Sequence, residues 1–369
     1  MSEAKNARSA AKRNLRKNSQ GISRGNSQWE SPLIQILPFS TVRSKAWLSV
    51  LVVGLAWSAW QIAGRAHNEP PPEGAIVLDH ADVTESSGIA RSRLRDGLLW
   101  THNDSGDSAR LFAFSEQGHL AARVKFTAAT AIDWEDMCSF DLAGKHFLAV
   151  ADVGDNGLAR PHVVVYGIEE PALQSPTRST KVRAPSMSDD PAAVERSIKP
   201  DPVTISCPLA WQIQIKYPDG PKNCEAMAFD PWREQLLLIT KERFRSHIYT
   251  VELDVKRPKQ SVTAKLVGTL LIPFVTGADI SDDGRRLALA TYGPTCLLSR
   301  DDSVDWTQAS AEQRHSANWK LATAEDMEWI EAPPRRQGES VCFDRTGNSL
   351  LMTSEGVPMP LWSAAVTPK

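Results

Sequence analysis

The chain has 369 residues, which suffices for one large domain or two of ordinary size. Its 42 Lys and Arg nearly balance its 44 Asp and Glu, so the formal net charge is only -2. This balance argues against a nucleic-acid-binding protein, because such a domain is normally markedly basic.

The first segment, residues 1–45, is a basic leader. It holds nine Lys or Arg, against Glu3 and Glu30 as its acids. A run of like charges repels itself and is typical of a segment without a fold of its own. We therefore expect a disordered leader, and the apolar stretch that follows it indicates that it lies in the cytoplasm.

Residues 46–64, "AWLSVLVVGLAWSAWQIAG", carry no charge. Their number falls within the roughly 17–25 residues that span a hydrocarbon core as a helix. Trp47, Trp57 and Trp60 lie towards the ends of the stretch, where indole rings favour the membrane interface. The basic residues just before it keep the N-terminus in the cytoplasm by the positive-inside rule. The sequence predicts a single-pass transmembrane helix, an uncleaved signal anchor, with the body of the chain outside the cytoplasm.

Two alternatives stay open for this stretch. A cleaved signal peptide would give a secreted protein, although its apolar region usually has only about 7–15 residues. No clean small-x-small cleavage site follows the stretch, and the segment "AGRAH" (residues 63–67) matches one only poorly. A buried core helix is the other alternative, but a core helix rarely follows so long a basic leader.

Residues 65–75 are a Pro-rich tether, and residues 76–369 predict an all-β domain. Short apolar runs alternate there with turn residues, and there is no amphipathic helix of normal length. Five similar units recur, each with polar residues, a short strand, a turn and a more apolar strand. The units are Glu85–Asp104, Asp133–Asn156, Asn223–Arg243, Thr276–Pro294 and Gln337–Gly356.

The spacing of these units predicts a β-propeller. We anchor the units on the first apolar residue of each first strand: Ile89, Met137, Met227, Ile280 and Val341. The anchors lie 48, 90, 53 and 61 residues apart, and spacings near 50 fit a four-stranded blade. We expect five four-stranded blades with residues 170–204 as a flexible insertion, or six blades if the long interval contains another one.

The remaining strands follow from the same pattern. They are expected at 110–115 and 121–126, at 162–168 and 211–217, at 246–253 and 264–271, and at 295–301 with a segment near 317–323. The fifth blade has 360–366 and lacks a fourth strand, which residues 75–80 would supply from the N-terminal end. A ring closed in this way has no free sheet edge.

The innermost strand of a blade starts at the face to which the second strand returns, so polar residues at both places should meet at one mouth of the channel. Carboxylates gathered there repel one another unless they are compensated. Ca²⁺, which takes six to eight oxygen ligands, is an economical compensation. The predicted calcium ligands are Glu85, Asp133, Glu135, Asp136, Asp152, Asp155, Asn156, Glu225, Asp279 and Glu339. The residues predicted to contact a small polar ligand are His102, Asp104, Trp134, Lys241, Tyr292 and Glu355.

Structural roles compete with these assignments. The acids also suit the acceptance of backbone N–H hydrogen bonds that fix the loops between blades. Trp134 fits burial in the core as well as stacking on a ligand, and Lys241 fits an ion pair with an acid better than the role of a base. Since no nucleophile elbow, P-loop or dinucleotide fingerprint occurs, no catalytic residue is assigned.

The five cysteines include no C-x-x-C pair, which makes a structural zinc site a poor fit. Cys207 and Cys224 bracket an expected strand and turn. In an oxidising compartment they are the candidates for a disulfide.

Several motifs carry a family resemblance that covers roughly Glu85 to Gly356. They are "LWTHNDSG", "DWEDM", "ADVGDN", "NCEAMAFD", "TGADIS" and "QGES". With these the chain resembles bacterial membrane-anchored or secreted β-propeller proteins of unassigned function. More distantly it is similar to the phytase-like and esterase-like propellers, which implies calcium held by acids at one mouth of the channel and no particular catalytic residue.

The sequence thus predicts a monomeric, membrane-anchored, extracytoplasmic β-propeller with a Ca²⁺-binding mouth that receives a small polar ligand. A metal-dependent phosphoester or ester hydrolase is one alternative, because a bound cation can activate water. A non-catalytic scaffold for a protein partner is the other, with the acids in purely structural roles.

Overall fold

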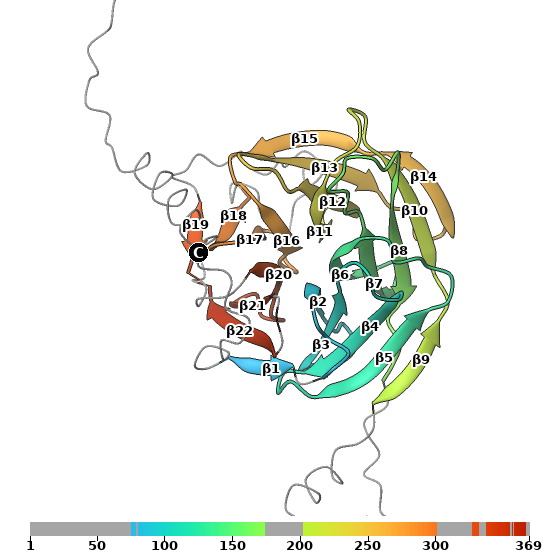
Figure 1. Cartoon of the computed structure of the whole chain (residues 1–369), viewed down its shortest axis with the longest axis vertical. Helices are drawn as coiled ribbons and strands as arrows, with labels where there is room; N and C mark the ends of the chain where they lie inside the picture. Colours follow the sequence, from blue (N-terminus) through green and yellow to red (C-terminus); the bar gives the residue numbers. More distant parts are fainter. Residues whose placement is uncertain are drawn as a thin grey trace, which may run out of the picture. The chain divides into compact units, whose positions relative to one another are not determined.

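The computed structural model describes residues 75–78, 80–173, 202–300, 327–331, 337–354, 356 and 358–366. They form five β-sheets set around an axis as the blades of a β-propeller (Figure 1). The predicted all-β fold with five blades is therefore confirmed. The leader and the predicted membrane span at 46–64 lie outside the described residues, and no helix within the described ranges is long and apolar enough to cross a membrane.

The strands of each blade are given from the innermost outwards. Blade one contains β2 (Ser86–Arg91), β3 (Leu98–Asn103), β4 (Arg110–Ser115), β5 (Leu120–Phe126) and β9 (Val203–Cys207). Blade two contains β6 (Trp134–Leu142), β7 (Lys145–Asp152), β8 (Val163–Glu169), β10 (Trp211–Lys216) and β14 (Lys259–Thr263). Blade three contains β11 (Cys224–Asp230), β12 (Gln235–Thr240), β13 (Ser246–Glu252) and β15 (Lys265–Leu270). Blade four contains β16 (Val275–Ile280), β17 (Arg286–Thr291), β18 (Thr295–Ser299) and β19 (Glu328–Ile330). Blade five contains β20 (Gly338–Phe343), β21 (Ser349–Ser354), β22 (Met359–Ala365) and β1 (Ile76–Leu78).

The core lies between the faces of neighbouring blades. Phe140 of blade two and Phe229 of blade three stack with ring centroids 4.0 Å apart. Trp100 of blade one and Trp134 of blade two belong to one buried cluster. Because the innermost strands are covered on both faces, they are buried along most of their length. This arrangement holds the starts of five distant chain segments around one axis.

Two blades contain a fifth strand that the sequence pattern does not predict. The chain leaves β8, adds β9 to the edge of blade one parallel to β5, and returns to blade two with β10. After β13 of blade three, the chain likewise adds β14 to the edge of blade two, parallel to β10, before it returns to blade three with β15. Figure 1 shows both strands on the outside of the preceding blade. The described part of the long interval therefore completes blade one and holds no sixth blade.

Blade four also departs from the expected pattern. Its fourth strand is β19, which pairs with β18 through Thr295 and Ile330. The segment expected there, near 317–323, lies outside the described residues. The observed fourth strand lies further along the chain, at Glu328–Ile330.

The ring is closed as predicted, by a strand from the N-terminal side of the domain. β1 pairs antiparallel with β22, with Ile76 opposite Leu361 and Leu78 opposite Met359. Leu78 is only 2% exposed and packs with Phe112, Phe114 and other apolar side chains of blades one and five. Closure therefore joins the two blades by packing as well as by hydrogen bonds.

The predicted disulfide is wrong. Cys207 lies on the outermost strand of blade one, whereas Cys224 begins the innermost strand of blade three. All five cysteines are buried and free. They act as small apolar side chains in the interior, as free cysteines commonly do.

The contribution of closure can be tested on the two ends of β1. We expect Leu78→Ala to lower the free energy of unfolding by about 2–5 kcal/mol, because it leaves a cavity between blades one and five. Ile76→Ala, on the same strand but at a residue 39% exposed, should cost less than about 1 kcal/mol. Urea denaturation of both variants measures the difference, and equal effects would show that β1 contributes little packing.

Candidate metal centre

The five innermost hairpins share one irregularity. In each, the register between the first two strands shifts by one residue near the start of the inner strand. The residues inside these shifts are Ser87, Glu135, Glu225, Thr276 and Glu339. A bulge leaves its extra residue out of the ladder and re-aims its side chain. Three of the five bulges therefore turn a glutamate towards the same end of the ring.

The shifts also correct the sequence alignment of blade four. Counting from the bulge at Thr276, the residue equivalent to the other anchors is Ala278 and not Ile280. The unit was misaligned by two residues because both positions are apolar. Asp279 therefore lies deeper along its strand than the predicted calcium ligands of the other blades.

Three carboxylates come together at the end of the ring where the bulges lie, which we call the acidic mouth. Asp104 follows β3, Asp133 precedes β6, and Glu135 is the bulged residue of β6. Their ligand atoms all lie within 4.8 Å of one another. Gly154 closes one side, since a Cβ there would lie 2.1 Å from Glu135 Oε1 and 2.4 Å from Asp133 Oδ2. Only a glycine lets the backbone approach the two carboxylates this closely.

Glu135 is the buried member of this group of three carboxylates. It is 5% exposed, and within the described ranges its carboxylate has neither a hydrogen-bond donor nor an ion-pair partner. Burial, with the charges of Glu225 and Asp104, raises the pKa of Glu135 well above its usual value. Burial and the charge of Asp104 likewise raise the pKa of Asp133. The acidic mouth therefore holds more negative charge than its own donors compensate.

A fourth carboxylate beside the group is already paired. Glu225 Oε2 lies 2.5 Å from Lys241 Nζ, and Glu225 Oε1 accepts a hydrogen bond from Asn223 Nδ2 at 3.0 Å. Burial lowers the pKa of Lys241, but the Glu225 carboxylate outweighs this effect and raises it overall. The ammonium group also lies over the Tyr292 ring, 4.6 Å from its centroid. Lys241 thus pairs with an acid, as expected, and is held as a cation.

Asp152, Asp155 and Asn156 fix the neighbouring loop instead of joining the three carboxylates. Asp152 accepts hydrogen bonds from the Ile132 and Asp133 amides and forms an ion pair with Arg160 at 2.8 Å. Asp155 accepts from the Ala159 and Arg160 amides. Asn156 is exposed and accepts from Asn223 Nδ2. These contacts position the backbone of Asp133 and Gly154.

Asp136 and Asp279 serve other parts of the ring. The buried Asp136 carboxylate accepts hydrogen bonds from the amides of Met137, Met227 and Ala278, at 2.8–2.9 Å. Asp279 accepts from the Phe343 amide at 2.8 Å and lines a pocket at the opposite end of the ring. Neither belongs to the group of three carboxylates at the acidic mouth.

The other two predicted calcium ligands lie apart from that group as well. Glu85 is exposed, and its backbone oxygen accepts a hydrogen bond from the Asp104 amide at 2.9 Å. Glu339 is buried on the bulge of blade five, where its carboxylate accepts a hydrogen bond from Gln337.

The predicted ligand-contacting residues separate by burial. Trp134 is 1% exposed, donates from its indole nitrogen to Thr130 O at 3.0 Å and packs edge-on against His102 at 5.6 Å. His102 is fully buried, and burial lowers its pKa. Neither ring has a face open to a ligand, whereas Asp104, Lys241 and Tyr292 are partly exposed. Glu355 lies outside the described residues.

Three further residues that build the site were not predicted. Gly154 admits the carboxylates, Arg160 holds the loop through Asp152 and the Gly154 oxygen, and Asn223 links Glu225 to the loop. The glycine in "DVGDN" is typical of a tight turn, but the sequence gives no sign that two carboxylates face it.

The likeness of this chain to known proteins is distant. No protein-family model and no curated protein matches the chain. It is similar to a putative 6-phosphogluconolactonase from Bacteroides uniformis, with 14% identity, 79% of this chain and 71% of that chain covered, and a TM-score of 0.35. It is also similar to the gluconolactonase XC5397 from Xanthomonas campestris (12% identity, 82% and 99% covered, TM-score 0.38) and to the hydrazine synthase of Kuenenia stuttgartiensis (9% identity, 77% and 84% covered, TM-score 0.39).

Likeness at this level assigns neither a family nor an activity. The fold and the site define the class of protein: a five-bladed β-propeller with three convergent carboxylates at one mouth that could bind a metal ion.

The charge at the mouth predicts how stability depends on pH. Because the folded-state pKa values of Glu135, Asp133 and Glu225 are raised, the native state binds more protons than the unfolded chain once pH exceeds their ordinary values near 4. This contribution to stability therefore falls as pH rises through the raised pKa values.

A cation at the mouth should remove this fall. We expect the protein to unfold at a lower temperature in the presence of a chelator than in millimolar Ca²⁺. The gap between the two thermal midpoints should widen as pH rises from about 4 towards 8. Contributions from groups away from the mouth, such as Asp279 at the opposite end of the ring, cancel in the difference. A difference that does not change with pH would contradict the expected coupling.

Proposed function

We propose that the protein is a Ca²⁺-binding β-propeller whose acidic mouth holds the ion through Asp104, Asp133 and Glu135 and presents it to a small polar ligand. The observation that carries the proposal is the Glu135 carboxylate, which is buried, receives no donor from the residues that the structure describes, and lies within 4.8 Å of two other carboxylate ligand atoms.

A cation is the simplest compensation for this charge. Burying an ionised carboxylate without a partner costs several kcal/mol, and like charges nearby increase that cost. The ammonium group of Lys241, whose charge acts on Glu135, already pairs with Glu225. A divalent ion between the three carboxylates would neutralise most of the charge, and Gly154 keeps the space beside them free of a side chain.

The donor set favours calcium among common ions. All three groups offer hard oxygen ligands, which suit Ca²⁺ and Mg²⁺ better than zinc or copper. Ligands on opposite sides of Ca²⁺ lie up to about 5 Å apart, against about 4 Å for Mg²⁺. The ligand atoms lie within 4.8 Å of one another, a spread that Ca²⁺ can bridge. Mg²⁺ demands near-ideal octahedral geometry, loses its waters reluctantly and is usually held by only one or two carboxylates, so a group of three suits it less well. The three carboxylates fill only part of a coordination shell of six to eight oxygens, which leaves positions for water or a polar ligand.

We further propose that the propeller lies outside the cytoplasm, tethered to the membrane by residues 46–64. The uncharged stretch and its basic leader support this placement. It would expose the site to the millimolar calcium for which extracellular modules are tuned. Fusion of alkaline phosphatase, which is active only outside the cytoplasm, to the C-terminal end should give activity in the membrane fraction. Activity in the soluble external fraction would indicate cleavage, and inactivity would refute the placement.

Calcium titration tests the site directly. We expect calorimetry to show one Ca²⁺ bound per chain, more tightly than Mg²⁺, with about 2.7 kcal/mol of added stability when Ca²⁺ reaches one hundred times its dissociation constant. Glu135→Gln should weaken binding at least about 100-fold and, in the presence of a chelator, make the protein more stable, because it removes a buried charge. Weaker binding together with greater stability cannot result from misfolding.

Two glycines of one loop provide a matched control. Gly154→Ala should weaken calcium binding, because its Cβ would displace the Glu135 and Asp133 carboxylates. Gly157→Ala places its Cβ in open space and should leave binding unchanged. Equal affinities in both variants, or no calcium binding by the unaltered protein, would refute the proposed site. Hydrolysis of phosphoester or carboxylester substrates that stops with a chelator would identify the hydrolase alternative.

A further inference from the structure

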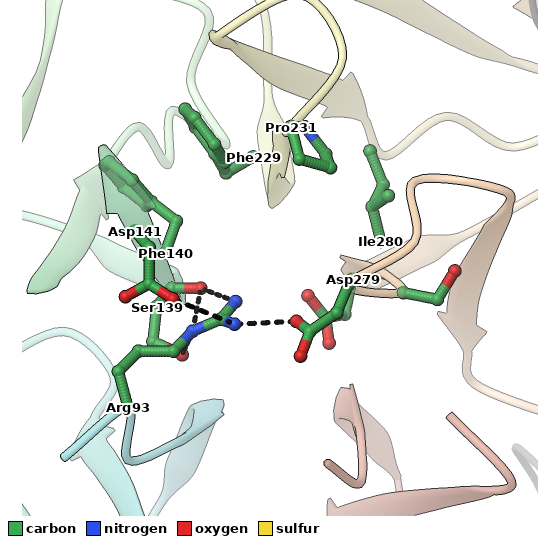
Figure 2. A pocket seen from close by; sticks show the side chains of 10 residues that line it. Arg93, Ser139, Phe140, Asp141, Phe229, Pro231, Asp279 and Ile280 are labelled. Carbon is green, nitrogen blue, oxygen red and sulfur yellow. Dashed lines mark hydrogen bonds and ion pairs between the residues drawn. The ribbon is translucent and has the colours of Figure 1, made fainter. Parts of the chain in front are cut away.

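The opposite end of the ring contains a pocket of about 180 Å³, built from the turn ends of the inner hairpins (Figure 2). Arg93 from the β2–β3 turn and Asp279 from β16 lie on opposite sides of it in Figure 2. Phe140, Phe229 and Ile280 form part of its wall. The pocket is separate from the acidic mouth, because the inner strands between the two ends are held together by the buried Asp136 carboxylate.

Negative charge exceeds positive charge in the lining of this pocket. It contains three aspartates, Asp141, Asp279 and Asp282, and one arginine. Arg93 Nη1 forms an ion pair with Asp282 at 2.6 Å, and its Nε and Nη2 donate to the Ser139 backbone oxygen. The arginine is thus already engaged, which disfavours an anionic ligand.

Asp279 carries the charge that is left. Its Oδ2 accepts the Phe343 amide at 2.8 Å, and within the described ranges no donor reaches its Oδ1. Asp141, in contrast, pairs with His146 at 2.6 Å, and Asp282 pairs with both Arg91 and Arg93. Burial raises the pKa of Asp279 to about 6 against the opposing charges of Arg93 and Arg91, so the group remains ionised at neutral pH. Among the described residues, neither arginine pairs with it directly, and its Oδ1 is open to a ligand.

The geometry selects among cationic ligands. The only group of carboxylates close enough to hold a metal ion within the described ranges is the one at the acidic mouth, so these three aspartates do not form a metal site. An ammonium group could instead donate to Asp279 Oδ1 while its hydrocarbon part packs on Phe229, Pro231 and Ile280. Pockets that combine apolar walls with a few convergent polar groups are the usual form of small-molecule sites.

We propose that this pocket is a second binding site, independent of the calcium site, that takes a small primary amine with an apolar body. Asp279 accepts the ammonium group, and Phe229, Pro231 and Ile280 contact the apolar part.

The test uses n-butylammonium as the probe, with n-butanol and butyrate as the neutral and anionic analogues, and the full chain in its membrane-mimicking detergent. Calorimetry at pH 7.5 should show binding of n-butylammonium and at least about tenfold weaker binding of either analogue. Asp279→Asn keeps the acceptor for the Phe343 amide and should weaken n-butylammonium binding at least about tenfold. Asp254→Asn, at an exposed aspartate paired with Arg257, controls for the change in net charge and should have no effect.

A second measurement needs no variant. In the unaltered protein, n-butylammonium should shift the NMR signals of Phe229 and Asp279 and leave those of Glu135 unchanged, with or without calcium. The proposal is overturned if n-butylammonium does not bind at tens of millimolar, if n-butanol binds equally well, or if the shifted signals lie elsewhere. Since none of these results depends on calcium, failure here leaves the calcium site untouched, and failure of calcium binding leaves this site untouched.

Discussion

The arrangement of three inner strands around the axis depends on the hydrogen bonds of one buried carboxylate. Asp136 accepts amide hydrogen bonds from its own strand β6, from β11 and from β16, so that a single side chain joins the inner strands of three blades. Burial raises its pKa well above the usual value, while the three amides favour the charged form. Hydrogen bonds from several amides are what make a buried carboxylate tolerable. Because these bonds fix the inner strands near the axis, they also determine what lies above and below them.

Glu135, which directly precedes Asp136 in β6, has an environment that does not satisfy its charge. The bulge between Trp134 and Asp136 turns it out of the ladder towards the mouth, where its neighbours are acids instead of amides. Two adjacent carboxylates thus differ in role because, in the part of the chain that the structure describes, Asp136 meets three donors and Glu135 meets none. The charge of Glu135 is buried at the mouth without compensation, whereas the charge of Asp136, in the middle of the ring, is compensated by three amides. We therefore expect a ligand at the mouth and not within the ring.

The sequence predicts the repeated, local features of this fold well. Tight turns rich in Asp and Gly, short apolar strands and their spacing gave the five blades and the closing strand β1. It does not predict β9 and β14, because a short edge strand that pairs with a distant segment has no local signature. Nor does it distinguish Glu135 from Asp136, since the bulge that separates their roles arises from pairing with β7. The end of the ring where the acids gather was predictable, whereas the choice of ligands required the register.

The strands β9 and β14, each added to the preceding blade, limit how such a protein can evolve. Repeat proteins commonly gain or lose whole repeats, because each unit is self-contained. Here blade one is completed by β9, which is encoded inside blade two, and blade two is completed by β14, which is encoded inside blade three. Duplicating or deleting one unit of the gene would leave a neighbour without its outer strand and expose an unpaired edge. The pairing of β9 and β14 with the preceding blades therefore fixes the number of blades. Sequence changes during evolution are then confined to the loops and to the residues at the two ends of the ring.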